Sequence, residues 1–201
     1  MWKFALHPGN WRLSQNVWTR ANALSSFLPA KRIDMSPKLI SALNKQANQE
    51  LQAAQAYLAM AYWCDVHHYA GFAKFFHEQV SEEHGHAGKI LKHLADRDVV
   101  PAIGVIAAPA VSFKNLNEIA KTVYDLERGN TAGIHAAYET ALAEKDYPGQ
   151  VLLHWFISEQ VEEEAWSDNL LVKTREATCA GALSSLDRHL SKVLSGDSSG
   201  D

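Results

Sequence analysis

The sequence has little cysteine and no long apolar run. Cys64 and Cys179 are the only cysteines among 201 residues, and they form no CxxC pattern. This excludes a framework of several disulfides, and we expect buried or idle thiols in a reducing compartment, with a single bridge as the alternative. No apolar run approaches the roughly 18 residues that a membrane-spanning helix needs. The net charge of −4 gives no reason to expect nucleic acid or an acidic membrane as a partner.

Acidic residues are absent from the first 33 positions, and Asp34 is the first acid. Five basic residues make this segment +5, a composition that also fits a transit peptide and organellar import. We favour a weakly ordered extension, or a start codon placed too early with Met35 as the true beginning, because no apolar core or cleavage site is visible. We therefore expect an extension over residues 1–34, one domain over 35–194 and a disordered tail over 195–201, in a cytoplasmic protein.

From Met35 onward, apolar residues recur every three to four positions, which predicts an all-α fold. Ser36 and Pro37 are typical of a helix start, and Asp146 can cap a later helix that has Pro148 in its first turn. We expect long helices near residues 37–64, 72–96 and 115–144, a fourth that begins after Asp146, and a short fifth near 181–194.

Residues 99–113 contain two prolines and a glycine and show no helical period. Fifteen residues without regular structure are unusually many for a connection within a compact domain. In a four-helix bundle such a segment can cross the whole length, so that the third helix runs parallel to the second. The sequence thus predicts a four-helix bundle with a long crossover and a short C-terminal helix.

Each of the four predicted apolar stripes carries a carboxylate: Glu50, Glu83, Glu127 and Glu163. On the fourth helix the predicted stripe is Leu152, Phe156, Glu159, Glu163, Trp166 and Leu170. His86 follows Glu83 by three residues and leaves the same helix face about one turn later. Unpaired carboxylates that converge on a core repel one another and are costly to bury. A pair of divalent cations removes this cost, and carboxylate with imidazole suits non-haem iron. Glu83, on the central helix, could bridge the two ions.

Residues 35–194 resemble the prokaryotic-type, non-haem ferritins of the ferritin-like di-iron superfamily, whose bundles carry this constellation. The resemblance rests on motifs in four helices that are specific only together. These are Asn48-Gln49-Glu50-Leu51 with Tyr57, Glu82-Glu83-x-x-His86, Glu127, Glu144-Lys145-Asp146-Tyr147, and Trp155-Phe156-x-x-Glu159-Gln160-x-Glu162-Glu163-Glu164.

The resemblance implies a hollow shell of 24 identical subunits that stores iron as a ferric oxyhydroxide mineral. Each subunit would be a ferroxidase that oxidises Fe(II) with dioxygen or hydrogen peroxide at a dinuclear centre. By position, the first iron site would comprise Glu50, Glu83 and His86. The remaining assignments are a second site of Glu83, Glu127 and Glu163, Gln160 near the oxygen-reactive face, a weaker third site of Glu82, Glu159, Glu162 and Glu163, and Tyr57 and Trp155 as electron donors.

Several of these residues have ordinary structural interpretations. Gln160 could hydrogen-bond within the core, a solvated face would explain Glu82, Glu159 and Glu162 almost as well, and Tyr57 and Trp155 could be core aromatics. The remaining histidines are interpreted as surface or capping residues: His67, His68, His77, His84, His93, His135, His154 and His189.

Departures from neighbouring families narrow the function. Bacterioferritins have a second Glu-x-x-His and a haem-binding methionine, whereas this chain has Gln160-x-x-Glu163 and His84 at those positions, so no haem is expected. Rubrerythrins need an iron site with four cysteines, which two cysteines cannot supply. Two alternatives stay open. One is an inert shell subunit that assembles with active partners, and the other is a di-iron oxidase or peroxidase that stores no iron.

Overall fold

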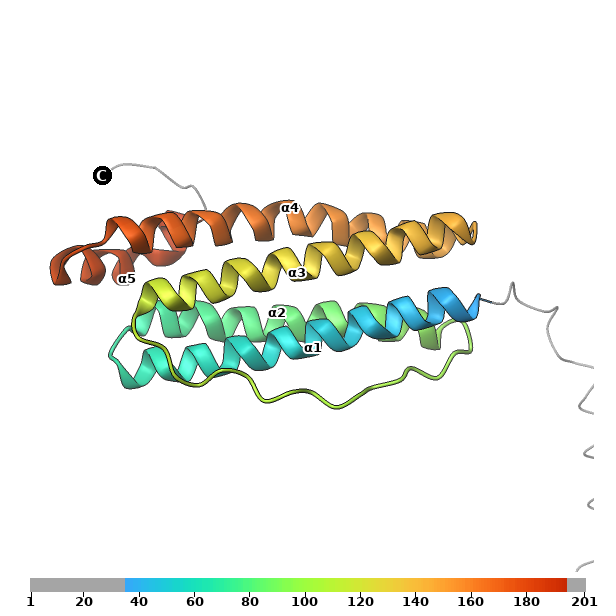
Figure 1. Cartoon of the computed structure of the whole chain (residues 1–201), viewed down its shortest axis with the longest axis horizontal. Helices are drawn as coiled ribbons and strands as arrows, with labels where there is room; N and C mark the ends of the chain where they lie inside the picture. The colour runs from blue at the N-terminus through green and yellow to red at the C-terminus, as the bar shows by residue number, and fades with distance from the viewer. Residues whose placement is uncertain (1–34, 195–201) are drawn as a thin grey trace, which may run out of the picture. The chain divides into compact units, whose positions relative to one another are not determined.

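The computed structural model describes residues 35–194, which form five helices and no strand (Figure 1). The predicted all-α fold is confirmed, whereas the predicted extension (1–34) and tail (195–201) lie outside the described residues. The five helices are α1 (Pro37–Val66), α2 (Ala70–Ala95), α3 (Leu116–Ala143), α4 (Tyr147–Glu176) and α5 (Ala180–Leu194).

Three of the long helices begin at a side-chain cap, as their sequences favour. The side chains of Ser36, Asn115 and Asp146 each accept a hydrogen bond from an amide of the following first turn, at 2.8 to 3.2 Å. Asp146 also accepts two hydrogen bonds of 2.7 Å from the guanidinium of Arg97. This bidentate pair ties the segment after α2 to the start of α4.

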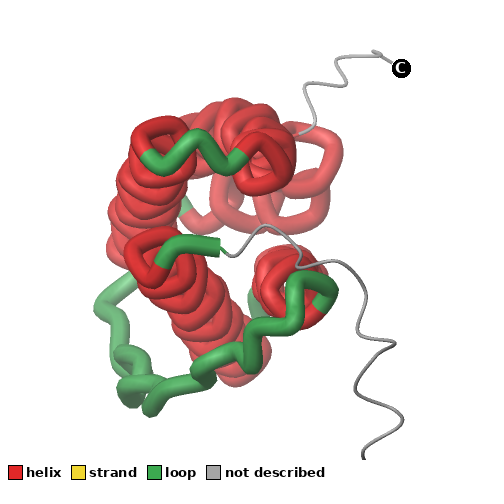
Figure 2. The backbone as a smooth tube through the Cα atoms, turned by 90° about the vertical axis from the view of Figure 1, so that its right-hand side faces the viewer, coloured by secondary structure: helices red, strands yellow, loops and turns green. Residues whose placement is uncertain are grey.

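The connections set the direction of each helix. Short turns make α1 and α2 one antiparallel hairpin and α3 and α4 another, and the predicted crossover joins the two (Figure 1). This segment runs outside the bundle along its length, so α3 is parallel to α2, as predicted (Figures 1 and 2). Asn44, Asn48 and Gln52 hold it through hydrogen bonds of 2.6 to 3.0 Å to its backbone. We call these three side chains the amide ladder.

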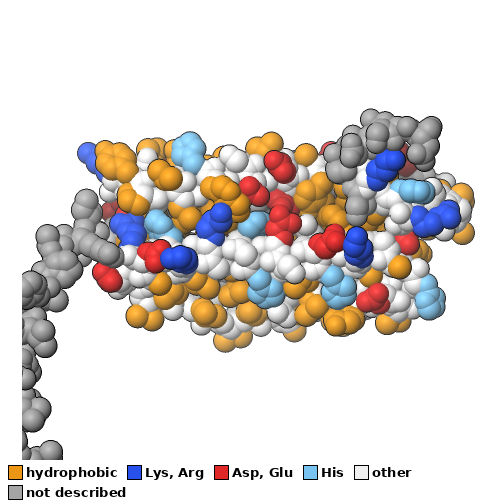
Figure 3. Space-filling model, turned by 180° about the vertical axis from the view of Figure 1, so that it is seen from behind, with side chains coloured by type: hydrophobic (Ala, Val, Ile, Leu, Met, Phe, Trp, Pro, Cys, Tyr) orange, Lys and Arg blue, Asp and Glu red, His pale blue; other side chains and the backbone are white. Residues whose placement is uncertain are grey.

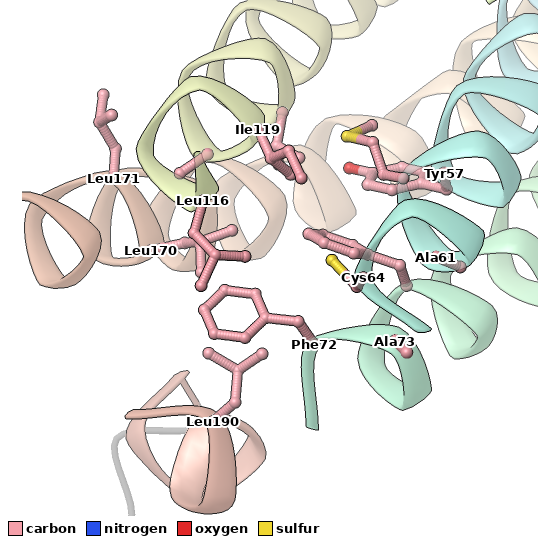
Figure 4. Packing of buried hydrophobic residues seen from close by; sticks show 14 of the residues in the cluster. Tyr57, Ala61, Cys64, Phe72, Ala73, Leu116, Ile119, Leu170, Leu171 and Leu190 are labelled. Carbon is pink, nitrogen blue, oxygen red and sulfur yellow. The ribbon is translucent and has the colours of Figure 1, made fainter. Parts of the chain in front are cut away.

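The bundle core consists of two apolar clusters. One includes Tyr57, Phe72, Phe76, Ile119 and Leu170, with Leu190 of α5 directed toward Phe72 (Figure 4). The other lies toward the opposite ends of the same four helices, and it includes Leu39, Leu43, Ile90, Leu94, Ile134, Leu153 and Phe156. On every long helix, the stretch between the two clusters includes polar residues that are buried.

The apolar stripes predicted for the first three long helices are buried throughout, but the prediction for the fourth is partly wrong. Leu152, Glu159 and Trp166 lie at the edge of the buried face rather than on it. The buried row instead runs Leu153, Phe156, Gln160, Glu163, Ser167 and Leu170.

The fifth helix packs against α2 and α4, and its contact with α2 depends on a glycine. A Cβ atom on Gly71 would lie 1.8 Å from the backbone oxygen of Asp187, so only glycine permits this approach. The Asp187 side chain also accepts a hydrogen bond of 3.0 Å from the Phe72 amide. These contacts close the end of the bundle that contains the first apolar cluster.

Candidate metal centre

Six polar side chains form a layer between the two apolar clusters, and none is more than 5% exposed. We call this group the acid layer. It contains Glu50 of α1, Glu83 and His86 of α2, Glu127 of α3, and Gln160 and Glu163 of α4. The four long helices lie side by side, and each of these residues lies near the middle of its helix. The six residues are therefore at one depth of the bundle. The predicted carboxylates thus lie at one depth of the bundle, but of the two predicted iron sites only the first, Glu50, Glu83 and His86, has its ligand atoms together within 4.8 Å.

The tightest group in the acid layer joins α1 and α2. Ligand atoms of Glu50, Glu83 and His86 all lie within 4.8 Å of one another. His86 Nδ1 is 3.5 Å from Glu83 Oε2, and Glu50 Oε1 accepts a 2.8 Å hydrogen bond from Gln46 Nε2. Glu50 Oε2 and Glu83 Oε2 are buried and accept no hydrogen bond. Each unsatisfied buried oxygen costs on the order of 1–3 kcal/mol, and a cation between them would remove that cost.

Burial and mutual repulsion raise the pKa values of these acids, so they keep their protons to a higher pH than exposed glutamates do. Burial, then the charge of Glu83, raises the pKa of Glu50 to about 8. Burial, then the charges of Glu127 and Glu82, raises the pKa of Glu163 to about 9. The pKa of Glu83 is raised well above its usual range by burial and by Glu127. A divalent cation that binds here must therefore displace protons from the carboxylates.

Glu127 is held by hydrogen bonds at both carboxylate oxygens. The Tyr57 hydroxyl donates to Oε1, and Asn130 Nδ2 donates to Oε2 at 3.3 Å. Burial raises the pKa of Glu127 to about 7, and the Tyr57 hydrogen bond opposes this rise. Burial also raises the pKa of Tyr57 well above its usual range, so this phenol stays protonated and remains a donor.

On α4, the carboxylate and the amide of the acid layer have different partners. Glu163 Oε2 accepts a hydrogen bond of 2.5 Å from the indole nitrogen of Trp166. Gln160 Nε2 donates to the backbone oxygen of Glu127 at 3.3 Å and to Thr131 Oγ1 at 3.1 Å. The Gln160 amide hydrogens are thus directed at α3, which is the hydrogen-bonding role that the sequence left open.

Three further acids line a pocket beside the acid layer. Glu82, Glu159 and Glu162 border a cavity of about 640 Å³ between α2 and α4, together with Glu163. We call it the acid pocket. Acidic side chains gather near the middle of this face (Figure 3). Ligand atoms of Glu82, His86 and Glu163 lie within 4.8 Å of one another, so the pocket and the acid layer share residues.

The two aromatic residues singled out in the sequence have different surroundings. Tyr57 is fully buried, and its ring lies 6.4 Å from that of Trp166. Trp155 is half-buried, 5.6 Å from the His86 ring, and the Lys89 ammonium lies 3.2 Å from the centre of its indole. A cation over the indole face disfavours removal of an electron from it.

Three residues that donate hydrogen bonds to the acid layer were not predicted from the sequence. Gln46 precedes Glu50 by four positions, Asn130 follows Glu127 by three, and Trp166 follows Glu163 by three. These are the spacings at which helix side chains meet, so a search for donors one turn from each buried acid would have found them. The eight histidines interpreted as surface residues are all exposed or half-buried.

The bundle, its long crossover and its buried carboxylates with one imidazole define a ferritin-like protein. Residues 40–177 match the sequence model of the ferritin family, described as a ferritin-like domain, and the chain belongs to this family. Within it, the chain is similar to bacterial non-heme ferritins. It is 43% identical over 131 residues to one from Staphylococcus epidermidis and 40% identical over 131 residues to one from Staphylococcus aureus. Each match covers 65% of this chain and 79% of the relative.

The solved structures agree with this assignment. An open pore ferritin from the archaeon Archaeoglobus fulgidus superposes with a TM-score of 0.75 at 33% identity, covering 78% of this chain and 98% of that one. A humanized archaeal ferritin gives 0.76 at 34% identity, covering 78% and 96%. Within residues 35–194, no helix combines the length and apolar character that crossing a membrane would require.

Proposed function

We propose that this protein stores iron and is a ferroxidase, with the acid layer as its dinuclear centre. The observation that carries the proposal is the set of buried carboxylates from four helices, two of which retain oxygens without a hydrogen-bond partner. The kinship with bacterial non-heme ferritins supports the choice of iron as the cation. Carboxylate and imidazole donors together suit ferrous iron in an oxygen-reactive site.

In this proposal Fe(II) is the substrate, and two ions bind in the acid layer. Glu50, Glu83 and His86 hold the first, and Glu83, Glu127 and Glu163 hold the second. Binding releases the protons that the raised pKa values of these glutamates retain in the metal-free protein. Each Fe(II) then gives one electron, and the two electrons together with two protons reduce dioxygen to hydrogen peroxide, or hydrogen peroxide to two water molecules. The shared carboxylate of Glu83 would hold the two ions next to each other, so that one oxidant molecule can accept both electrons.

Neighbouring residues orient these carboxylates. Gln46, Asn130 and Trp166 donate hydrogen bonds that fix the Glu50, Glu127 and Glu163 side chains. Tyr57, whose hydroxyl already donates to Glu127, is the better-placed electron donor of the two candidate aromatics, because its proton has a ready acceptor. Lys89 over Trp155 argues against a similar role for that indole.

We further propose that the oxidised iron passes to a weaker third site in the acid pocket, at Glu82, Glu159, Glu162 and Glu163. From there it would enter a mineral of ferric oxyhydroxide inside a homo-oligomeric shell of 24 subunits. We propose residues 35–194 as the ferritin-like domain of each subunit. Support for the shell comes from the family and from the archaeal relative described as an open pore ferritin.

Aerobic loading of the metal-free protein with Fe(II) tests the proposal. We expect a fast oxidation phase in stopped-flow absorbance, an oligomeric mass far above that of one chain, and an electron-dense core after loading. A shell without the fast phase would instead support an inert subunit. Fast oxidation in a monomer or dimer that retains only a few irons would support a non-storing oxidase.

A further inference from the structure

We propose that Gly133 of α3 is a positioning residue for the acid layer. Because it has no side chain, the amide of Gln46 can lie against α3 in the orientation that holds Glu50 of α1. Neither Gly133 nor Gln46 belongs to a proposed iron site. The inference deepens the proposed function and rests on it for the role of Glu50 as a metal ligand.

The close approach of Gln46 to α3 provides the first observation. A Cβ atom added to Gly133 would lie 2.1 Å from Gln46 Oε1 and 3.2 Å from Gln46 Cδ. The first distance is far below van der Waals contact, so any side chain at position 133 must displace the glutamine amide. Gln46 is only 1% exposed, and its amide is therefore enclosed by the protein on the other sides.

The hydrogen bond from Gln46 to Glu50 provides the second observation. Gln46 Nε2 donates to Glu50 Oε1 at 2.8 Å, and Glu50 Oε2 is buried without a hydrogen-bond partner in the described part of the chain. Because a side-chain amide is planar, a shift of its oxygen carries its nitrogen with it. A group at position 133 that displaced Gln46 Oε1 would therefore break this hydrogen bond. Through Gln46, Gly133 thus determines which oxygen of Glu50 remains for a cation.

A second glutamine borders the same space over Gly133. Gln49 Oε1 would lie 3.1 Å from the added Cβ, and Gln49 Nε2 donates a 3.1 Å hydrogen bond to Asn130 Oδ1. Asn130 in turn donates to Glu127 Oε2 at 3.3 Å. A Gln46 oxygen that moved toward Gln49 would meet another carbonyl oxygen, and the two would repel each other. Gln46 therefore cannot yield in that direction at low cost.

A comparison with a second glycine of α3 isolates the close approach. Glycine is an unfavourable residue inside a helix, yet Gly129 and Gly133 lie one turn apart near the middle of α3. At Gly129 the nearest atom to an added Cβ would be Gln49 Nε2 at 3.8 Å, an ordinary van der Waals contact. The packing thus requires glycine at position 133 and not at position 129, so the two positions provide a matched pair.

Zinc, which does not change oxidation state, tests the positioning role without any iron chemistry. Metal-free crystals of the full-length wild-type, Gly133→Ala and Gly129→Ala proteins are soaked in increasing concentrations of Zn²⁺. The readout is the Zn²⁺ concentration at which the anomalous peak at the first iron site reaches half its final height. We expect Gly133→Ala to raise this concentration roughly tenfold, as for loss of other orienting partners, and Gly129→Ala to leave it unchanged. Equal concentrations in all three proteins would overturn the proposal.

A double variant separates positioning through Gln46 from a general change in α3. Gln46→Ala removes the amide and should by itself weaken Zn²⁺ binding at the first iron site roughly tenfold. In that background Gly133→Ala has no amide to displace, so we expect no further loss. A further loss of the same size would refute the proposal, because Gly133 would then not act through Gln46. Far-ultraviolet circular dichroism confirms that each variant is folded.

The outcomes separate this inference from the proposed function. If Gly133→Ala weakens Zn²⁺ binding at the first iron site but the wild-type protein does not oxidise Fe(II), the ferroxidase proposal fails and the positioning role stands. If Fe(II) oxidation is fast but Gly133→Ala binds Zn²⁺ as tightly as the wild-type protein, the reverse holds. Wild-type crystals without a Zn²⁺ peak at this site would overturn the first iron site and this inference with it.

Discussion

The two helical hairpins hold their buried acids in different ways. In the α1–α2 hairpin, Glu50 and Glu83 each leave one buried oxygen without a hydrogen-bond partner. In the α3–α4 hairpin, both oxygens of Glu127 accept hydrogen bonds, and Glu163 accepts one from Trp166. An unsatisfied oxygen can bind a cation without losing a donor, whereas a satisfied one must share or exchange its partner. The first hairpin is therefore the side on which we expect the first cation to bind.

The largest effect should come from the residue that both proposed iron sites share. Glu83→Gln keeps the shape of the side chain but removes its charge, so we expect Fe(II) oxidation to slow by roughly 100-fold or more. The metal-free protein should at the same time gain about 1–3 kcal/mol in unfolding free energy, because a costly buried carboxyl has gone. Stopped-flow absorbance and urea unfolding measure the two effects. Oxidation within a factor of two of wild type would contradict the bridging role.

The acid layer should also make the unfolding free energy of the metal-free protein depend on pH. The pKa values of Glu127, Glu50 and Glu163 rise to about 7, 8 and 9 in the folded state, above their ordinary values. At pH values between the ordinary pKa of a glutamate and these raised values, the folded state binds more protons than the unfolded state. The unfolding free energy therefore falls as pH rises from about 5 to 9. We expect the melting temperature to fall over this interval in chelator and to fall much less in saturating Zn²⁺. Equal slopes with and without Zn²⁺ would show that the ion does not bind the carboxylates.

A smaller effect should follow from loss of one hydrogen bond to the acids of the α3–α4 hairpin, donated by a residue of α1. Tyr57→Phe removes the hydroxyl that donates to Glu127 and opposes the rise of its pKa. We expect Fe(II) oxidation to slow roughly tenfold and Zn²⁺ binding at Glu127 to move to higher pH, since the proton competes better. Tyr62→Phe is the matched control, because Tyr62 is 59% exposed on the same helix. If Tyr57→Phe and Tyr62→Phe oxidise Fe(II) at the same rate, the hydrogen bond from the Tyr57 hydroxyl to Glu127 does not contribute to the reaction.

The smallest effect should come from the outer face of α1. Asn48 makes hydrogen bonds to the backbone of Asn44, Ala102 and Gly104, at 2.6 to 2.7 Å. Asn48→Ala should lower the unfolding free energy by about 1 kcal/mol and leave Fe(II) oxidation unchanged, because these bonds point away from the acid layer. Urea unfolding measures the change in stability, and stopped-flow absorbance on the same sample measures the rate of Fe(II) oxidation. A large loss of oxidation would mean that the crossover supports the centre after all.

Helix periodicity predicted three of the four long buried faces fully, and α4 shows where it reaches its limit. Two stripes through this helix share Phe156, Glu163 and Leu170 and differ only at adjacent pairs. Two of these pairs, Leu152 with Leu153 and Glu159 with Gln160, offer residues of similar size to both faces. The neighbouring helices decide between them, and they select Leu153 and Gln160. Information of this kind is absent from the pattern of one helix.

The carboxylates of the candidate site could be predicted because a buried charge is conspicuous on an apolar stripe. The hydrogen bonds that distinguish the hairpins could not, since Tyr57 and Glu127 are 70 residues apart and on different helices. Their contact depends on how α1 and α3 pack. A tyrosine on a buried stripe is an ordinary core residue until its neighbour is known.

The amide ladder has a consequence for engineering. In the crossover, its three side chains contact only main-chain N–H and C=O groups, at Ala102, Gly104 and Ala107. Such a tether recognises the path of the segment and not its side chains, several of which, including Val105, are exposed on the single chain. Substitution of these outward residues should therefore leave the course of the backbone unchanged, so the segment can be varied without loss of the tether.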